Sequence, residues 1–136
     1  MLSKIKFIDV FNSIKGQIER NTGKTCYDYI PKDVKPPFYS LEFLPKRSEN
    51  NKTMWVEVWT IWVHCYAESD ESRLGIFTLI EALEEAMTEE LSLPDEAILL
   101  SQDDGGVIRL DKEKDEFHAV LEFSFKISYG YKAKIL

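Results

Sequence analysis

The stretch Thr53–Ala67 constrains the fold of this chain more than any other. It reads TMWVEVWTIWVHCYA and is rich in the aromatic and β-branched residues that favour a strand. Apolar side chains fall on both faces of this strand, namely Met54, Val56, Val58 and Trp62 on one and Trp55, Trp59, Ile61, Val63 and Cys65 on the other. A strand of this kind is normally covered on both faces. At ~3.3 Å per residue it would span roughly 45–50 Å. A small chain has little core to cover that length, so we predict that part of the strand meets another subunit.

The composition is that of one soluble globular unit. The 136 residues, 44% hydrophobic and 30% charged, fit a single α+β domain over residues 1–136. No apolar run approaches the ~20 residues that cross a bilayer, and Lys4, Lys6 and Asp9 interrupt any signal-peptide core. We therefore expect synthesis in the cytosol, no membrane partner, and reduced, buried thiols at Cys26 and Cys65.

Hydrophobic periodicity predicts two helices, over residues 3–20 and 71–90. Strands are predicted at Thr25–Ile30, Tyr39–Phe43, Thr53–Ala67, Ala97–Ser101, Val107–Leu110 and Glu116–Tyr129. Asp103–Gly106 is predicted as a tight turn, and Ser69 and Asp70 as caps of the second helix. The order α-β-β-β-α-β-β-β predicts an α+β fold with a largely antiparallel sheet and both helices on one face. Thr53–Ala67 and Glu116–Tyr129 should be the two longest strands and should reach beyond the helix-covered core.

Charge is distributed unevenly along the chain, whose net charge is −7. Residues 68–116 hold sixteen acidic and four basic residues, whereas the remainder holds eight acidic and thirteen basic ones. An acidic protein without a basic stripe is a poor binder of a phosphate backbone, so we expect no sequence-specific nucleic-acid binding. Two interpretations of the asymmetry stay open. It indicates either a solvated acidic surface that keeps the protein soluble, or opposite faces that meet head to tail in a ring.

No residue constellation indicates catalysis. His64 and Cys65 are adjacent, so on a strand they point to opposite faces and cannot share a metal. His118 has no predicted nucleophile partner, and no nucleophile-elbow pattern occurs in the chain. The turn Asp103–Gly106 lacks the spaced acids of an EF-hand, and the chain has no glycine-rich phosphate loop. We therefore predict no enzyme activity, no metal and no cofactor.

Several residues are instead candidates for a protein interface. Trp55 and Trp59 flank Glu57 on one strand face, where the acid would repel a phosphate chain. Glu89 and Glu90 end the second helix, at its partially negative pole, which is an unfavourable place for acids. The basic loop Pro45–Lys52 has almost no apolar anchor and should be mobile until assembly orders it. The candidate interface residues are Lys46, Arg47, Trp55, Glu57, Trp59, Glu89 and Glu90.

The strand WVEVWTIWVHCYAE, running into the helix SDESRLGIFTLIEALEEAM, resembles the small tail-terminator or tail-to-head joining proteins of long-tailed phages and of prophages in Gram-positive bacteria. The resemblance covers nearly the whole chain as a pattern of elements. It implies an α+β virion structural protein without an active site, whose subunits close into a hexameric ring at the end of the tail tube. The implied partners are further copies of the chain, the tail-tube protein and a head-completion protein, with DNA passing through the bore. The implied location is the bacterial cytoplasm during assembly and then the virion tail.

Two other classes of function remain as alternatives. The first is a cytosolic immunity-type protein, whose acidic, aromatic surface would inhibit a basic toxin. The second is a small-ligand-binding α+β domain, which would need a real cavity. A terminator should form a ring, whereas an immunity protein should be monomeric or dimeric. The mass in solution therefore separates a tail terminator from an immunity protein.

Overall fold

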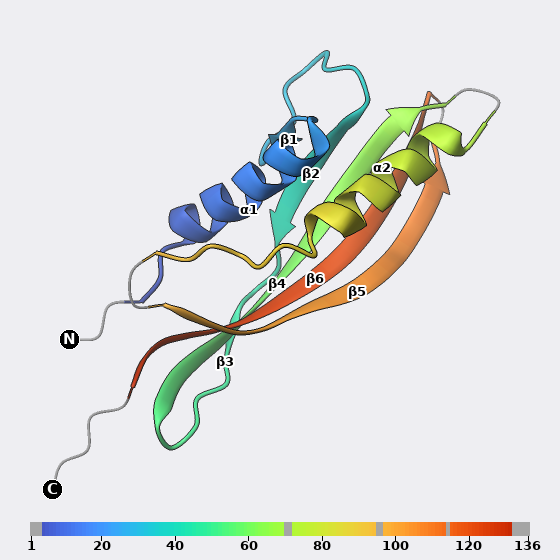
Figure 1. Cartoon of the computed structure of the whole chain (residues 1–136). Helices are drawn as coiled ribbons and strands as arrows, with labels where there is room; N and C mark the ends of the chain where they lie inside the picture. Colours follow the sequence, from blue (N-terminus) through green and yellow to red (C-terminus); the bar gives the residue numbers. More distant parts are fainter. Residues whose placement is uncertain (1–3, 70–71, 95–96, 114, 132–136) are drawn as a thin grey trace, which may run out of the picture.

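The computed structural model describes residues 4–69, 72–94, 97–113 and 115–131. Its elements in chain order are α1 (Phe7–Thr22), β1 (Cys26–Tyr27), β2 (Phe38–Phe43), β3 (Arg47–Ser48), β4 (Met54–Glu68), α2 (Leu74–Ala86), β5 (Ile98–Lys112) and β6 (Glu116–Tyr131). The strands form one sheet in the order β1-β2-β4-β6-β5, and β3 pairs with β4 beside that path. Every pairing is antiparallel except β1 with β2. Figure 1 shows both helices on one side of this sheet. The predicted α+β class is therefore confirmed.

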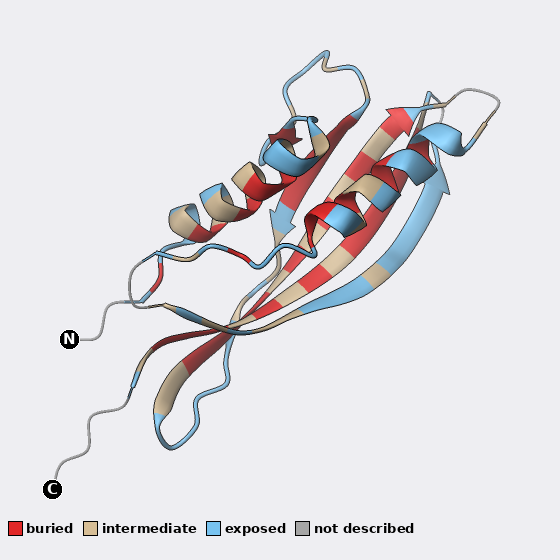
Figure 2. Cartoon of the chain, viewed as in Figure 1, coloured by how far each residue is buried: buried red, intermediate tan, exposed pale blue. Residues whose placement is uncertain are grey.

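Alternation along β4 and β6 builds the core. The side chains of these two strands that face the helices are fully or almost fully buried, and they include Trp59, Ile61, Val63, Leu121, Phe123, Phe125 and Ile127. Each helix covers them with its own apolar stripe, comprising Val10, Ile14 and Ile18 in α1 and Ile76, Leu79 and Leu83 in α2. Figure 2 shows the buried positions following β4, β6 and the inner sides of the helices. The central position of β4 agrees with the apolar character of its sequence.

A buried hydrogen bond ties the helix layer to the sheet. The Tyr39 hydroxyl on β2 donates to the Leu79 carbonyl of α2 at 2.7 Å. Burial raises the pKa of Tyr39 well above its usual range, so the hydroxyl keeps its proton and remains a donor.

The paired strands β4 and β6 continue past the helices, as predicted. In Figure 1 the β3–β4 hairpin and the end of β6 extend beyond the start of α1. β6 has 16 residues and β4 has 15. The prediction that these two would be the longest strands is wrong in one respect, because β5 also has 15 residues.

The predicted turn at Asp103–Gly106 is wrong. The two short strands expected on either side of it are a single strand, β5, which pairs with β6 along its whole length through three register irregularities. One irregularity lies between Asp104 and Gly106, where Gly106 has a φ of 76°. A Cβ on Gly105 would lie 3.2 Å from the backbone oxygen of Glu122, so the glycine allows close approach of two strands. The glycines therefore accommodate a bulge, not a reversal of the chain.

Several element boundaries differ from the predicted ones. Helix α1 spans Phe7–Thr22, so it begins and ends later than the predicted range 3–20. Helix α2 is shorter than the predicted range 71–90, and Arg73 stands at its N-cap position without a side-chain cap. Of the two predicted caps, Asp70 lies outside the described residues. The predicted strand Thr25–Ile30 contracts to the two residues of β1. The predicted stop of the first helix is confirmed by Gly23, which ends α1 with a φ of 71°.

The loop Pro45–Lys52 has anchors that sequence reasoning missed. Its short strand β3 pairs with Val58 and Glu57 of β4. The Glu49 carboxylate forms an ion pair with the Lys126 ammonium at 2.5 Å. The side-chain oxygen of Asn50 accepts a hydrogen bond from the backbone N–H of Val56 at 2.8 Å. The anchors are polar rather than apolar, and the mobility of this loop in a lone subunit stays a prediction.

Candidate functional site

The first candidate surface lies where α1 begins. Phe7 and Ile8 stand there 49% and 57% exposed, and Phe7 packs edge-on against Trp59 at 4.8 Å between ring centroids. The Lys46 ammonium lies 4.8 Å from the centre of the Phe7 ring and 4.7 Å from that of Trp59. Lys6 is exposed at the helix N-cap position and makes no side-chain cap hydrogen bond. We call Lys6, Phe7, Ile8 and Lys46 the basic apolar patch.

Glu57 is a buried acid beneath this patch. It is 2% exposed, and its carboxylate lies 3.2 Å from the Lys46 ammonium and 4.0 Å from that of Lys4. A buried charge is tolerated when it is paired in this way, and removal of its partner would leave it unpaired. The side chains of Glu57 and Lys46 are therefore held by each other within one subunit.

Three of the predicted interface residues near the basic apolar patch, two tryptophans and one arginine, differ in how far they are buried. Trp59 is 1% exposed and belongs to the core, and its indole Nε1 has no hydrogen-bond partner among the described residues. Trp55 is half-buried next to a register irregularity between it and Val56. Arg47 is exposed and pairs with Glu49 at 3.5 Å. Of these three, Arg47 and Trp55 have side-chain surface accessible in the subunit, whereas Trp59 is covered.

Glu89 has partners on the other helix, which the sequence did not reveal. Its carboxylate accepts hydrogen bonds from Asn21 at 2.7 Å and Arg20 at 2.8 Å, both near the end of α1. These bonds, that of Asn21 first, hold the pKa of Glu89 below its usual value. The unfavourable position of an acid after the C-terminus of α2 is therefore offset within the subunit.

Two glutamines hold the chain as it leaves α2. Gln17 of α1, which is buried, donates to the carbonyls of Ala86 at 3.0 Å and Glu89 at 2.8 Å. Gln102 of β5 donates to the carbonyls of Met87 at 2.7 Å and Glu89 at 2.8 Å. Since the last carbonyls of a helix lack partners within it, these amides act as a C-terminal cap supplied by other elements. Sequence analysis identified neither glutamine.

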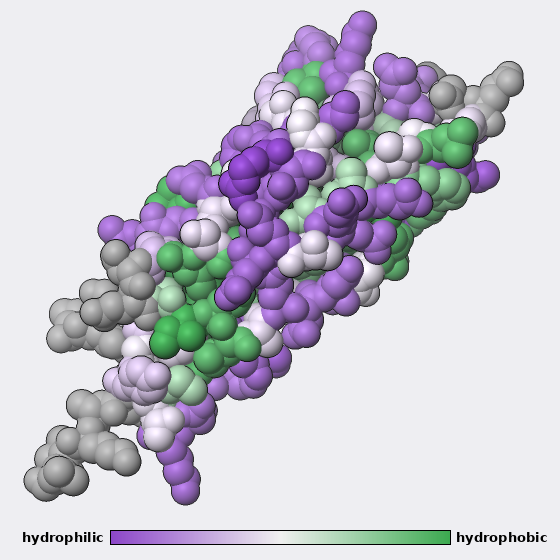
Figure 3. Space-filling view, viewed as in Figure 1, coloured by the Kyte–Doolittle hydropathy of each residue, from purple (hydrophilic) through white to green (hydrophobic). Residues whose placement is uncertain are grey.

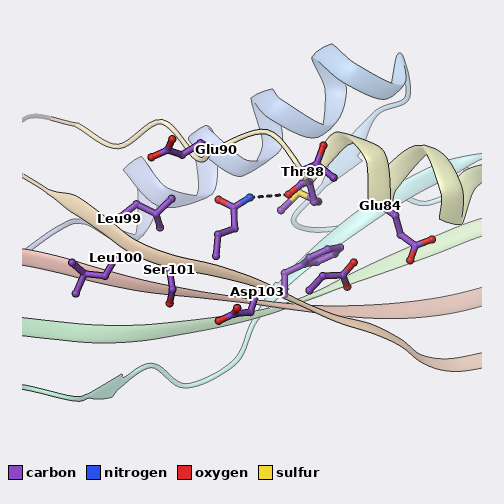
Figure 4. A pocket seen from close by; sticks show the side chains of 11 residues that line it. Glu84, Thr88, Glu90, Leu99, Leu100, Ser101 and Asp103 are labelled. Atoms are coloured by element: carbon purple, nitrogen blue, oxygen red, sulfur yellow. Dashed lines mark hydrogen bonds between the residues drawn. The ribbon is translucent and has the colours of Figure 1, made fainter.

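The second candidate surface is a groove between the C-terminal half of α2 and the first half of β5. It has a volume of about 400 Å³. Its apolar lining consists of Met87, Leu99, Leu100 and Phe123, and its acidic lining consists of Glu84, Glu90, Asp103 and Asp104. Figure 4 shows Glu84 on the helix, Glu90 on the segment that follows it, and Leu99 and Asp103 on β5. We call this the acidic groove.

The sheet face away from the helices carries a chain of polar side chains. Nδ1 of His64 lies 2.8 Å from Nε2 of His118, and Nε2 of His64 lies 2.7 Å from Glu42. Nδ1 of His118 lies 3.3 Å from Glu113. All three contacts can be hydrogen bonds at the same time only when the four ring nitrogens of His64 and His118 together carry three protons. Burial, followed by the charge of His64, lowers the pKa of His118, which favours its neutral form.

Among the described residues, no group of three or more His, Cys, Asp or Glu side chains is arranged to hold a metal ion. Within the same residues, no helix has the length and apolar character that a membrane span requires. The arrangement of surfaces described above is suited to protein contacts.

Comparison with known proteins decides the family. A family model of phage tail terminators, described as tail termination proteins, matches residues 1–135. The chain belongs to this family. No curated protein matches the sequence. A tail terminator is a structural component of the virion tail that contacts other tail or head components. The predicted resemblance is therefore confirmed, and the immunity-protein alternative has no support.

In a tail terminator, the predicted interface residues belong to two regions of the subunit. Lys46, Arg47, Trp55, Glu57 and Trp59 lie on β3, β4 and the segment before them, and Glu89 and Glu90 follow α2. Their role at an interface stays a prediction. Sequence reasoning missed the apolar residues of β5, because it divided that strand into two short pieces. The signal in the sequence was the adjacent pair Val107 and Ile108, which places apolar side chains on both faces of the strand.

Proposed function

We propose that this tail terminator closes into a homo-oligomeric ring, a hexamer, at the end of the tail tube. The observation that carries the proposal is strand β5, an edge strand of 15 residues. Five of its large apolar side chains are exposed, namely Ile98, Leu100, Val107, Ile108 and Leu110. Long apolar edge strands favour association with another chain. A neighbouring subunit that covers β5 would account for this surface.

The uneven charge supports contacts of one kind repeated around a ring. Six copies of a chain with net charge −7 would carry −42, so close packing requires opposite charges at the seams. In a head-to-tail contact, the acidic segment 68–116 of one subunit would meet the more basic remainder of the next. Among the predicted interface residues, Glu90 and Arg47 are exposed and are the charges most available for such a seam.

The proposed ring would lie between the tail-tube protein and a head-completion protein, after assembly in the bacterial cytoplasm. Excess negative charge on the bore would repel the phosphate backbone, so DNA would pass without binding. Exposed ion pairs contribute only ~0.2–1 kcal/mol each. Apolar contacts, including those of β5, would therefore supply most of the association free energy.

The test is the mass of the purified protein in solution over a range of concentrations, measured by light scattering and accompanied by electron microscopy. The expected mass is about 95 kDa, six times the 15.8 kDa of the chain. Ile108→Asp should lower the mass, whereas Tyr29→Asp, at an exposed aromatic residue away from β5, should leave it unchanged. A mass of one chain at every concentration, with and without tail tubes, would refute the ring.

Mobility of the loop Pro45–Lys52 provides a separate measurement. If assembly orders this loop, amide hydrogen exchange in residues 45–52 should be faster in a subunit kept apart by Ile108→Asp than in the ring. Equally slow exchange in the two forms would show that the bonds of Glu49 and Asn50 already fix the loop in a single subunit.

A further inference from the structure

The exposed apolar side chains of the subunit gather on the side formed by α2 and β5. Eleven large apolar side chains are exposed among the described residues, and five of these are the β5 residues named above. Leu74 and Phe77 of α2 add two more. Figure 1 shows α2 over β4 and β6, whereas β5 runs along the edge without a helix above it. Figure 3 shows apolar surface beside polar surface where the chain enters β5.

The acidic groove on this side lacks cations of its own. Its lining contains four acids and no lysine or arginine, but Asp103 also lines a second pocket with Arg47 and Lys126 on the sheet face away from the helices. Among the described residues, none of Glu84, Glu90, Asp103 and Asp104 makes an ion pair. The other three acids, Glu84, Glu90 and Asp104, surround the apolar floor and repel one another. A ligand surface that suits this groove is therefore both apolar and positively charged.

The basic apolar patch of the same chain has this character. Phe7 and Ile8 supply exposed apolar surface, and Lys6 supplies an exposed positive charge beside it, whereas the ammonium of Lys46 is already paired with Glu57 at 3.2 Å. The start of α1 adds to this charge, because a helix N-terminus carries partial positive charge and this one has no side-chain cap.

The two surfaces are formed by different elements, the patch by the start of α1 and the residue before β3, and the groove by α2 and β5. Helix α1 lies on the β1–β2 side of the helix layer, and β5 is the opposite edge of the sheet (Figure 1). A contact between different surfaces of identical subunits is heterologous, and it generates a ring when its rotation closes. We infer that the acidic groove of one subunit receives the basic apolar patch, Lys6, Phe7, Ile8 and Lys46, of the next subunit. This inference rests on the proposed ring and assigns its seam.

A pair of charge reversals tests the inference. The first variant is Lys6→Glu, which reverses the exposed charge of the patch and leaves the groove unchanged. The second is Glu84→Lys with Glu90→Lys, which leaves Asp104 as the acid facing the groove, makes the groove basic and leaves the patch unchanged. In either variant alone, like charges face each other at every seam, and the apparent dissociation constant should rise by roughly a hundredfold or more. In an equal mixture, each acidic groove can meet a basic patch and each basic groove an acidic patch. The mixture should therefore recover the parent mass as rings of alternating subunits.

Matched controls carry the same charge changes elsewhere. Lys24→Glu changes an exposed lysine just after the end of α1, and Glu85→Lys changes an exposed acid of α2 that does not line the acidic groove. Both should keep the parent mass. Circular dichroism of every variant separates loss of assembly from loss of fold, and recovery in the mixture excludes misfolding independently.

Each outcome has a definite consequence. If both variants assemble like the parent, the seam lies elsewhere while the ring stands. If each variant is monomeric and the mixture stays monomeric, the two surfaces do not meet each other, and this assignment of the seam is wrong. If the parent itself never exceeds the mass of one chain, the proposed ring fails together with the seam.

Discussion

Replacement of Gln102 by glutamate tests whether its amide caps the end of α2. The side-chain nitrogen donates to the carbonyls of Met87 and Glu89 at 2.7 and 2.8 Å, while the side-chain oxygen accepts from the Leu91 backbone N–H at 3.0 Å. Glutamate has nearly the same shape and keeps the acceptor for Leu91. It loses both donors and directs a carboxylate oxygen at two carbonyl oxygens.

The magnitude follows from those bonds. Two lost hydrogen bonds cost about 1–3 kcal/mol in total. A negative charge at the negative pole of a helix costs about 0.3–1 kcal/mol more. The unfolding free energy should therefore fall by roughly 1.5–4 kcal/mol at pH 7, and the melting temperature should fall by roughly 6–16 °C in a chain of this size.

The assay is thermal unfolding followed by circular dichroism, on protein whose mass has been checked. Asn12→Asp makes the same amide-to-acid change at an exposed position of α1 and serves as the control. At pH 4 a share of the new carboxyl is protonated and can donate one bond, so the difference from the parent should narrow. A melting temperature for Gln102→Glu within about 1 °C of the control at pH 7 would refute the capping role.

Three further predictions follow from burial and charge. Trp59→Ala should lower the unfolding free energy by about 3–5 kcal/mol in urea titrations, because the indole lies in the core; a loss below about 1 kcal/mol would contradict that placement. Stability should fall as the pH drops below the ordinary histidine pKa of about 6.5. Burial and the neighbouring His64 lower the pKa of His118, so the folded protein binds a proton at His118 less readily than the unfolded chain does. His118→Gln should flatten this part of a stability-against-pH curve, and an unchanged slope would exclude the histidine pair as its cause. Burial raises the pKa of Cys26 to about 12 and raises that of Cys65 also, so a thiol reagent at pH 8 should label both only as the chain unfolds; rapid labelling of the native protein would show that these sites open.

Strand β4 could be predicted because it is an unbroken stretch rich in aromatic and β-branched residues, and β6 because its sequence alternates over most of its length. Strand β5 could not. The segment Asp103–Gly106 has the residues of a tight turn, and the same residues also suit a bulge in a continuous strand. What decides between the two is the partner, since β6 offers 16 residues for pairing. Length of a partner strand is a tertiary property and is not visible in the local sequence.

The candidate site shows the same division. The acidic and basic segments were evident from the sequence, and so was the anomaly of Glu89 at a helix end. The residues that bind the Glu89 carboxylate, Arg20 and Asn21, belong to another helix and lie 69 and 68 residues away in the chain, so the sequence did not show this pairing. Gln17 offered a weaker signal, as a polar residue between Ile14 and Ile18 in the apolar stripe of α1. His64 and His118 could be paired only once the register of β4 with β6 was known.

The backbone carbonyl of Glu89 accepts hydrogen bonds from Gln17 on α1 and Gln102 on β5. One atom thus joins the helix that carries the basic apolar patch to the strand that borders the acidic groove. In a ring assembled through those two surfaces, a force applied at one seam would cross each subunit along this short route to the next seam. The segment after α2 would then connect the two seams through two amide side chains, of which Gln102 also lines the acidic groove.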